Sequence, residues 1–525
     1  MNFGDKIKFF NYRPLVSVCL FLIAGIIFAV GIFINNLTMF ILGIVSSICL
    51  IVSLVVKSIV AKDKKLIKIL AIIIAFFIGF GVTGISLSVQ NRTNVVKGEY
   101  YVSGSVSNYT FTSSSGLKVV TIDDVKITNV KTLKQQSLTC KVRLYLNSGD
   151  GRTEEFKLGE EVEGVFSLKK SDFMVKGKLN FYMINKGIKV LGFGSEDDIV
   201  SKNEINPSLF DKIKVKVKST LDTYMSKEYS ELGYTMLFGD KTNLDVNIAN
   251  NYSESGIGHL LAVSGLHVGF VVTLLSLLLS LFKANNKVRF FVITIVVFLY
   301  AFLCGFSISV TRAFIMTTIL LFSKLRNKKY DSLSSLSFAA IILLLCNPLF
   351  LFDIGFILSF SAVAGIIIFA RTFTNFFNKF LNDKLSSVIA VSLSATIGTM
   401  PAMMLSFNNL SIFSIITNVI VIPIASVAYM LMFAFVFVAM ILPPLGVFMY
   451  MFEFLMRIVS GISQITGSIN LVNTMQIFVI LFSIGLISTA IIISDYCIVK
   501  KKSRVIMASC LSLFTLVSMI MMFIC

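Results

Sequence analysis

The sequence has only two histidines, and only 14% of its 525 residues are charged. Soluble domains average about 25% charged residues, so this composition excludes an ordinary soluble protein. Two histidines cannot build a His-rich metallohydrolase site, and neither has a cysteine neighbour to complete a zinc site. The spacing of a phosphate-binding loop is also missing, which argues against an ATPase. We therefore expect no catalytic residues, no metal and no cofactor, and do not predict an enzyme.

Cysteine is scarce in the one polar part of the chain. Of eight cysteines, only Cys140 lies between residues 90 and 205, so no disulfide can form within that segment. The remaining cysteines lie in or near apolar runs, where a small buried hydrophobic residue is the usual role.

Apolar runs fill most of the chain, in keeping with a hydrophobic fraction of 56%. About 20 apolar residues in a helix cross a hydrocarbon core of about 30 Å. The first run is expected to be a retained anchor, because a second run follows almost at once. The runs cover 15–34, 37–56, 66–89, 258–282, 290–322, 335–352, 354–370, 387–406, 411–442, 445–467, 474–494 and 505–524. Those at 290–322 and 411–442 exceed one span and predict either two helices or one helix with a re-entrant piece.

The segment 90–205 is polar and has the alternation of β-strands. In "CKVRLYLN", Val142, Leu144 and Leu146 alternate with polar or aromatic residues, which predicts a half-buried strand. Four further strands are expected in "YYVSGSVSNYTF", "KVVTIDDVKI", "EEVEGVFSLK" and "KGIKVLGF". Five short strands fit a small barrel such as an OB-fold. The predicted fold is an α-helical polytopic membrane protein with an inserted OB-like β-barrel.

The net charge of +19 lies mainly in short loops between apolar runs. Such loops are typical of the cytoplasmic side of membrane proteins, so the charge is not evidence for nucleic-acid binding. With residues 1–13 and 57–68 in the cytoplasm, three spans place residues 90–205 outside the cell. A stretch near 209–225 has apolar residues at helical spacing between lysines, which predicts a helix on the bilayer surface, although the alternating lysines also fit a strand.

A few ionisable residues stand inside apolar runs, where such groups usually line a cavity or pair with each other. Glu453 and Arg457 are four residues apart in the favourable order, which favours a structural pair in one helix. Arg312 and Asp353 either pair with each other, or Arg312 faces a passage for an anion. A helix cap is the alternative for Asp353.

Both histidines lie in "GHLLAVSGLHVG". On one continuous helix, His259 and His267 would be about 80° apart and share a face. Gly265 and Gly269 form a G-x-x-x-G spacing that allows a close helix crossing. Three interpretations remain open: a tight crossing, a Ser264 nucleophile activated by His267, and a polar strip along a passage where glycines break the helix.

At these residues the sequence resembles the ComEC competence proteins, inner-membrane channels for DNA uptake in natural transformation. The resemblance rests on "LFGDKTNL", "GIGHLLAVSGLHVG", "SVTRAFIM", "DIGFILSFSAVAGI", "GTMPAM" and "NVIVIPIAS", in this order, with "NFYMINKGI" before them. It covers nearly the whole chain. It implies that recurrent family positions are occupied by Gly239, Asp240, His259, Ser264, Gly265, His267, Arg312, Asp353, Gly355 and Pro401.

The apolar runs and the polar segment, together with the resemblance, divide the chain into four predicted parts. They are an N-terminal three-helix membrane segment (1–89), an extracellular OB-like domain (90–205), an amphipathic surface helix with a linker (206–255) and a competence-type polytopic channel domain (256–525). Many family members carry a further metallo-β-lactamase-like domain, and no His-rich motif of that kind occurs in this sequence.

The resulting prediction is a cell-membrane channel for single-stranded DNA. Its channel or gating candidates are Asp240, His259, Ser264, Gly265, His267, Arg312 and Asp353. Candidates for base stacking are Tyr101, Tyr109, Phe111 and Tyr145, with core packing as the alternative for each. The expected partners are the lipid bilayer, a DNA receptor at the cell surface, a cytoplasmic ATP-driven motor, a separate nuclease and further copies of the chain. The alternatives are a secondary transporter of a small anion and a membrane-embedded Ser/His hydrolase.

Overall fold

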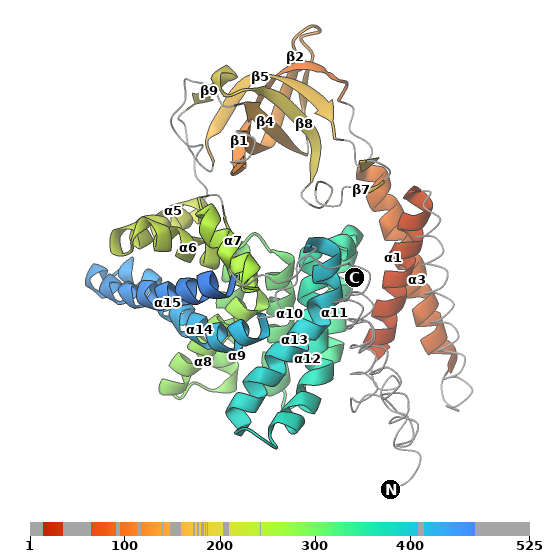
Figure 1. Cartoon of the computed structure of the whole chain (residues 1–525). Helices are drawn as coiled ribbons and strands as arrows, with labels where there is room; N and C mark the ends of the chain where they lie inside the picture. Colours follow the sequence, from red (N-terminus) through yellow and green to blue (C-terminus); the bar gives the residue numbers. More distant parts are fainter. Residues whose placement is uncertain are drawn as a thin grey trace, which may run out of the picture. The chain divides into compact units, whose positions relative to one another are not determined.

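A computed structural model of the protein describes most of the chain (Figure 1). The described residues are 14–34, 65–90, 95–112, 117–138, 140–147, 159–171, 174–175, 178–179, 183, 185, 187–202, 209–241, 243–407 and 414–467. The apolar runs predicted at 37–56, 474–494 and 505–524 lie outside these residues.

The chain divides into two compact units. The first comprises Met1–Cys19, Val217–Leu343 and Ile354–Cys525, and its described part is helical. The second comprises Leu20–Lys216 and Leu344–Asp353 and contains all the described strands. The four predicted parts stay a prediction.

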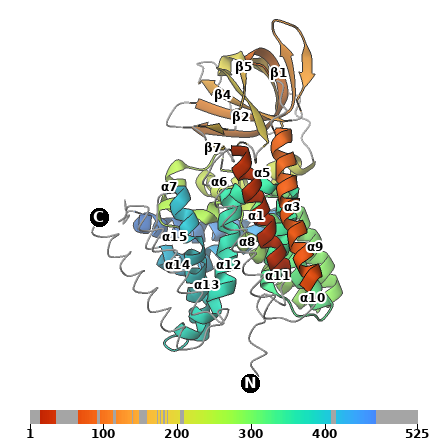
Figure 2. The same ribbon diagram turned by 90° about the vertical axis from the view of Figure 1, so that its right-hand side faces the viewer.

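The β structure is a barrel closed by five strands, as the sequence predicts (Figure 2). Around the barrel the strands are β1 (Gly98–Thr112), β2 (Leu117–Asn129), β4 (Lys141–Asn147), β8 (Ile188–Ser195) and β5 (Glu161–Lys170), with β5 pairing back to β1. Only β4 and β8 pair in parallel, and every other pair in this ring is antiparallel. This order with a single parallel pair is that of an OB-fold.

Short strands flank the barrel, and alternating side chains fill it. The flanking strands are β3 (Gln135–Ser137), β9 (Ile199–Lys202) and the hairpin of β6 (Met174–Val175) with β7 (Lys178–Leu179). Ile122, Leu144, Leu146 and Leu168 are completely buried in the core. On β4 the buried residues alternate with residues that face outward, which confirms the predicted period of two.

Eight described helices are long and apolar enough to span a membrane. These spans are Pro14–Phe33, Ala71–Ser88, Asn286–Leu303, Ile308–Leu325, Ile354–Phe377, Asp383–Met403, Thr417–Ala439 and Pro443–Thr466. In lipid the backbone must satisfy its own hydrogen bonds, and a helix does this within one segment. The protein is therefore a multi-pass helical membrane protein with an inserted small barrel.

The helices follow the apolar runs, with a few differences. They are α1 (Pro14–Ile34), α3 (Lys65–Gln90), α8 (Gly265–Leu281), α9 (Asn286–Leu303), α10 (Ile308–Leu325), α11 (Ser332–Cys346), α12 (Ile354–Phe377), α13 (Asp383–Phe407), α14 (Ser414–Ala439) and α15 (Met449–Gly467). The long run at 290–322 forms two helices, because Gly305 and Phe306 take positive φ values and turn the chain. The run at 411–442 forms one described helix, α14, with Pro423 inside it.

Helices α12 and α13 pack closely along two of the family-like motifs. A Cβ atom added at Gly365 would collide with the carbonyl oxygen of Ser394, and one added at Gly398 would approach the carbonyl oxygen of Ser361 at 2.5 Å. Both glycines are therefore needed for the close approach of the two backbones. This packing accounts for the glycines of "SFSAVAGI" and "IGTMPAM".

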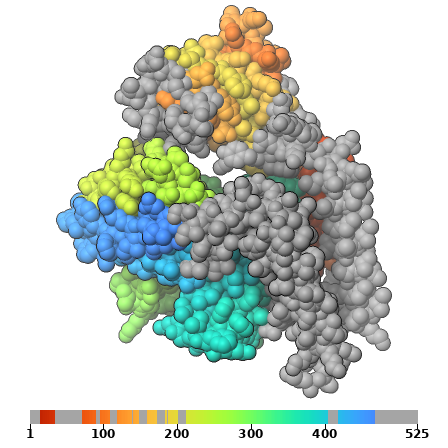
Figure 3. All heavy atoms as spheres, in the orientation of Figure 1, coloured from red at the N-terminus to blue at the C-terminus, as the bar shows by residue number. Residues whose placement is uncertain are grey.

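Three helices lie between the barrel and the 3-10 helix η3 (Gly258–Leu261) in the sequence. They are α5 (Leu209–Tyr224), α6 (Lys227–Phe238) and α7 (Val246–Glu254). The stretch near 209–225 is thus a helix, and its Val217 and Leu221 are completely buried. The linker predicted after it contains α6 and α7. In Figure 3 the atoms of α6 and α7 (yellow-green) lie against those of α15 (blue).

Candidate functional site

The helical run that contains both histidines is broken just before α8. His259 lies in the 3-10 helix η3 (Gly258–Leu261), and Ala262 and Ser264 then take extended backbone conformations. A new helix starts at Gly265. The expectation that both histidines share one helical face is therefore wrong, because two extended residues interrupt the helix between them. His259 is exposed, whereas His267 is completely buried.

Ser264 and His267 cap the start of α8. Ser264 Oγ accepts a hydrogen bond from the backbone N–H of Leu266 at 3.2 Å. In return, the Nδ1 atom of His267 accepts the backbone N–H of Ser264 at 3.2 Å, and Ser264 Oγ is also 3.2 Å from Nδ1. An Nδ1 that accepts an amide proton belongs to the tautomer with its hydrogen on Nε2. Among the described residues, that buried Nε2 has no hydrogen-bond partner.

Two buried tyrosines extend this polar group across three other helices. The ring of Tyr429 in α14 lies 4.6 Å from the imidazole of His267, edge to face. Its hydroxyl is 2.8 Å from that of Tyr300 in α9, which donates to the carbonyl oxygen of Leu237 in α6 at 2.9 Å. Since Tyr300 gives its proton to Leu237, Tyr429 is the donor between the two hydroxyls.

The turn after α6 brings the other family-like motif to the same place. Gly239 ends α6 in a left-handed conformation, with a φ of 78°. A Cβ added there would lie 3.2 Å from Cγ2 of Val263, the residue before Ser264. Thr235 Oγ1 donates to the backbone oxygen of Asp240 at 2.6 Å and fixes the turn. The segments around Asp240 and Ser264 are therefore adjacent.

Arg312 of α10 is buried against the first residue of α8, Gly265. Its guanidinium donates from Nη1 to the carbonyl oxygen of Ser359 in α12 and lies 5.8 Å from the ring of Phe360. Nη2 occupies the space that a Cβ atom on Gly265 would need. Arg312 is 6% exposed, forms no ion pair with any described carboxylate, and its Nε has no described partner. A buried charge without a counterion is costly, so this group favours an anion beside it.

Ser264, Gly265, His267, Tyr300, Arg312 and Tyr429 together form what we call the α8 cluster. The structure thus brings together Ser264, Gly265, His267 and Arg312 of the sequence candidates. In contrast, no described atom lies within 4 Å of a Cβ built on Gly269, so the predicted G-x-x-x-G crossing stays a prediction. Asp353 belongs to the other unit and stands directly before α12, so its roles as a cap or as a partner of Arg312 stay predictions.

Glu453 and Arg457 form a close pair in α15. Arg457 donates to Oε1 of Glu453 from Nη2 at 2.5 Å and from Nε at 3.2 Å. The same carboxylate accepts the backbone N–H and the hydroxyl of Ser226, both at 3.0 Å. Ser226 is the N-cap residue of α6, so a side chain of α15 caps that helix.

The barrel carries an aromatic pair on the outer face of β4 and β8. The rings of Tyr145 and Phe193 are stacked, with centroids 5.5 Å apart and planes 13° from parallel. The guanidinium of Arg143 lies 5.8 Å from the Tyr145 ring. Tyr101 is exposed on β1, and its hydroxyl bonds to Glu163 on β5. Tyr109 and Phe111 lie in β1 with side chains outside the described set.

Reasoning from sequence missed Tyr300, Tyr429, Arg143 and Phe193. Tyr300 and Tyr429 each place a hydroxyl group within a long apolar run, and this pattern could have marked them as buried polar residues. Arg143 lies two residues before Tyr145 in β4, so the period of two already places both side chains on one face. Phe193 joins Tyr145 only through the parallel pairing of β4 and β8, which no local pattern indicates. Among the described residues, no group of three His, Cys, Asp or Glu side chains could hold a metal ion.

The comparisons with known proteins concern the same part of the chain. The family model described as "Competence protein" matches residues 236–495. ComE operon protein 3 of Bacillus subtilis is 30% identical over 185 residues, which are 35% of this chain and 23% of that protein. Recombination protein 2 of Haemophilus influenzae is 25% identical over 205 residues, 36% of this chain and 26% of that protein.

A third relative, an uncharacterized protein of Aquifex aeolicus, is 31% identical over 224 residues, 42% of this chain and 50% of that protein. The chain therefore matches half or less of the length of each of these relatives. No solved structure matches it. All members of the α8 cluster lie within residues 236–495, and this part of the chain is a competence-protein domain.

Proposed function

We propose that this protein passes single-stranded DNA across the cell membrane during natural transformation. The competence-protein domain supports DNA uptake as the process. The fold supports transport, since apolar spans surround a small set of buried polar groups and a separate barrel resembles single-strand-binding modules. In this proposal the chain performs transport and no catalytic step.

One observation carries the proposal: Arg312 is a buried cation with no carboxylate partner among the described residues. Nucleic-acid phosphates are anions that pair well with a planar guanidinium. His267 adds a buried Nε2 donor whose hydrogen points away from the Ser264 cap. In the proposal, Arg312 meets successive phosphates, and His267 with Ser264 holds the start of α8 beside it.

The barrel is proposed to lie outside the cell and to receive the strand. Its stacked Tyr145 and Phe193 offer a flat aromatic surface, and Arg143 supplies a nearby positive charge. Bases stack on such surfaces without regard to sequence, and each stacked base contributes about 1–3 kcal/mol. Tyr101 is a separate exposed aromatic residue on β1, but its hydroxyl bonds to the acidic Glu163, so we assign the main stacking role to Tyr145.

The proposed partners follow from what the chain would need. A surface receptor would deliver DNA to the barrel, and a cytoplasmic ATP-driven motor would draw the strand inward. A separately encoded nuclease would remove the other strand, and further copies of the chain would complete the assembly. Asp240, His259 and Asp353 are proposed as further contacts or gate residues near the family-like motifs.

The test is uptake of labelled DNA by a competent host that lacks the chromosomal copy. The strain is complemented with wild type, Arg312→Gln, Arg312→Lys or His267→Ala, and with Arg371→Gln as a matched control. Arg371 is an exposed arginine near the end of α12. We expect DNA to bind at the surface in every strain, but to enter only with wild type and the control, with partial entry for Arg312→Lys. Membrane levels are compared by blotting.

Full uptake in the deletion strain would contradict the proposal. Arg312 also fits a small anionic solute, so uptake of labelled inorganic anions is measured in parallel. Loss of that uptake with DNA uptake intact would favour a secondary transporter. A Ser264 hydrolase is the weaker candidate: Ser264 Oγ is 3.2 Å from His267 Nδ1, but that Nδ1 also accepts the Ser264 amide in the helix cap, and no described carboxylate orients Nε2.

A further inference from the structure

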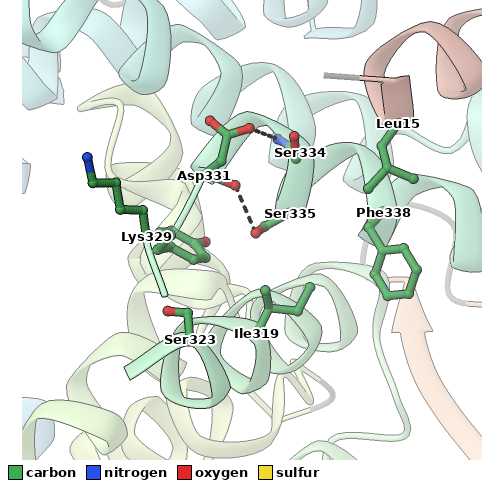
Figure 4. A pocket seen from close by; sticks show the side chains of 9 residues that line it. Leu15, Ile319, Ser323, Lys329, Asp331, Ser334, Ser335 and Phe338 are labelled. Carbon is green, nitrogen blue, oxygen red and sulfur yellow. Dashed lines mark hydrogen bonds between the residues drawn. The ribbon is translucent and has the colours of Figure 1, made fainter. Parts of the chain in front are cut away.

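A cavity of about 340 Å³ lies in the helical unit, separate from the α8 cluster (Figure 4). It is formed where α10 ends and α11 begins, beside Leu15 in the first turn of α1. Its size is within the range of sites that hold small molecules. The proposed transport of DNA gives this cavity no role.

The two ends of the cavity differ in chemistry. Leu15 and Phe338 form an apolar wall at one end, and Ile319 lines the side near them (Figure 4). Lys329 stands at the opposite end, with Ser323 below it. The cavity is therefore suited to an amphiphile with an anionic head and an apolar tail.

The acidic residue in the cavity, Asp331, serves the local fold. Its Oδ2 accepts the backbone N–H of Ser334 at 3.0 Å, and Ser335 Oγ donates to its backbone oxygen at 2.9 Å (Figure 4). Asp331 thus stabilises the first turn of α11 as a cap residue.

The surrounding turn carries an excess of positive charge. Four exposed basic residues stand against the single acidic residue Asp331 between positions 324 and 331, and these are Lys324, Arg326, Lys328 and Lys329. A negatively charged headgroup would reduce the mutual repulsion of these cations. A phosphocholine headgroup would instead bring another cation to them.

The position of the cavity along the helices fits a membrane boundary. The span of α10 ends at Leu325, and the apolar helix α11 begins at Ser332. The turn between them therefore lies where hydrocarbon gives way to headgroups. Basic pockets between membrane helices at this level bind anionic lipid headgroups.

We propose that this cavity binds an anionic phospholipid, with its phosphate beside Lys329 and its acyl chains against Leu15 and Phe338. A soluble phosphate would leave the apolar wall exposed to water, so a lipid is the better match. The site goes beyond the proposed DNA transport and does not depend on it.

The absence of tryptophan makes a direct test possible. Phe338→Trp places a single fluorophore in the wall of the cavity, in the full chain reconstituted into vesicles of phosphatidylcholine and phosphatidylglycerol. The acyl chains of one lipid or the other are brominated, so that a lipid resident in the cavity quenches the fluorescence. We expect the apparent association constant to be about fivefold higher for phosphatidylglycerol, and Lys329→Gln to bring the two lipids to parity.

Phe291→Trp is the matched control for a basic loop whose residues do not line this cavity. Phe291 is 58% exposed in α9, close to Lys287 and Arg289. A general attraction of anionic lipid to basic loops would give the same preference at both positions and would overturn the proposal. Equal quenching by both lipids in the Phe338→Trp chain would overturn it as well.

A second measurement leaves the wall of the cavity unchanged. The wild-type chain is extracted in mild detergent, supplied with phosphatidylglycerol and analysed intact by mass spectrometry. Retention of one phospholipid per chain, reduced about fivefold by Lys329→Gln and unchanged by Lys287→Gln, is the expected result. Glycerol 3-phosphate is added as a competitor, and displacement of the lipid by it would show a headgroup-only site and contradict the role of the apolar wall.

Discussion

Two arginines in apolar helices of this protein have opposite surroundings. Arg457 in α15 is half exposed, and it pairs with Glu453, which in turn holds the start of α6. Arg312 in α10 is buried, and among the described residues its guanidinium donates to one carbonyl oxygen, lies near one aromatic ring and packs against Gly265. The first charge is accounted for by the fold, whereas the second is not. In the proposed function, Arg312 is therefore the residue to which an anion from outside the protein binds.

The largest effect on DNA uptake is expected when Arg312 is given a carboxylate partner in its own helix. Ile308→Glu places a carboxylate four residues before Arg312, the spacing and order of Glu453 and Arg457. If Arg312 binds phosphates, the new carboxylate competes with them, and DNA uptake falls about a hundredfold, since a paired buried charge differs from an open one by about 3 kcal/mol.

Ile308→Gln has nearly the same shape without the charge and serves as the control for that experiment. Uptake is measured by internalised labelled DNA at equal membrane levels. If the Ile308→Glu variant takes up DNA as well as the wild type, DNA uptake does not depend on an Arg312 free of a carboxylate partner.

Removing the other charge should affect stability rather than transport. Glu453→Gln loses the carboxylate that accepts from Ser226 and Arg457, and we expect the free energy of unfolding to fall by about 1.5–3 kcal/mol. Thermal unfolding of the purified chain and hydrogen exchange at the first turn of α6 measure this. Glu254→Gln, at an exposed position in α7, should leave both unchanged. Faster exchange elsewhere with α6 unaffected would argue against the capping role.

Two tyrosines of the barrel differ in the same way, since one is bonded to a charged residue of the protein and the other is not. Tyr101 bonds through its hydroxyl to Glu163, whose negative charge repels phosphates, whereas Tyr145 stacks on Phe193 beside Arg143. We expect Tyr145→Ala to weaken binding of a labelled oligonucleotide to the full chain about tenfold, the value of one lost stack. Tyr101→Ala should change the dissociation constant less than about twofold. Equal effects of the two substitutions would remove Tyr145 from its proposed role.

The smallest expected effect concerns the two glycines of α8. A Cβ at Gly265 would displace the guanidinium of Arg312, so Gly265→Ala should lower DNA uptake several-fold. No described atom lies within 4 Å of a Cβ on Gly269, so Gly269→Ala should stabilise the helix by up to about 1 kcal/mol and leave uptake unchanged. A matching loss of uptake in both variants would show that α8 itself, and not its contact with Arg312, is what uptake requires.

The sequence was informative wherever a local pattern decides the outcome. The period of two in β4 predicted its buried residues, and the length of the apolar runs predicted α12, α13 and α15. The prediction that His259 and His267 share a helical face was wrong, because Ser264 takes the extended conformation of an N-cap residue and the helix begins only at Gly265. Tyr300 and Tyr429 come from helices far along the chain, and their meeting depends on tertiary packing that local periodicity does not encode.

The bond between Ser226 and Glu453 also bears on how the protein is made. The two residues are 227 positions apart in the chain. At synthesis rates of about 5–20 residues per second, the first turn of α6 is without its carboxylate cap for roughly 10–45 s after it is translated. The carboxylate that accepts from the N-cap residue of α6 is therefore supplied only after α15 has been synthesised, although Tyr300 of α9 can bond to the end of α6 much earlier.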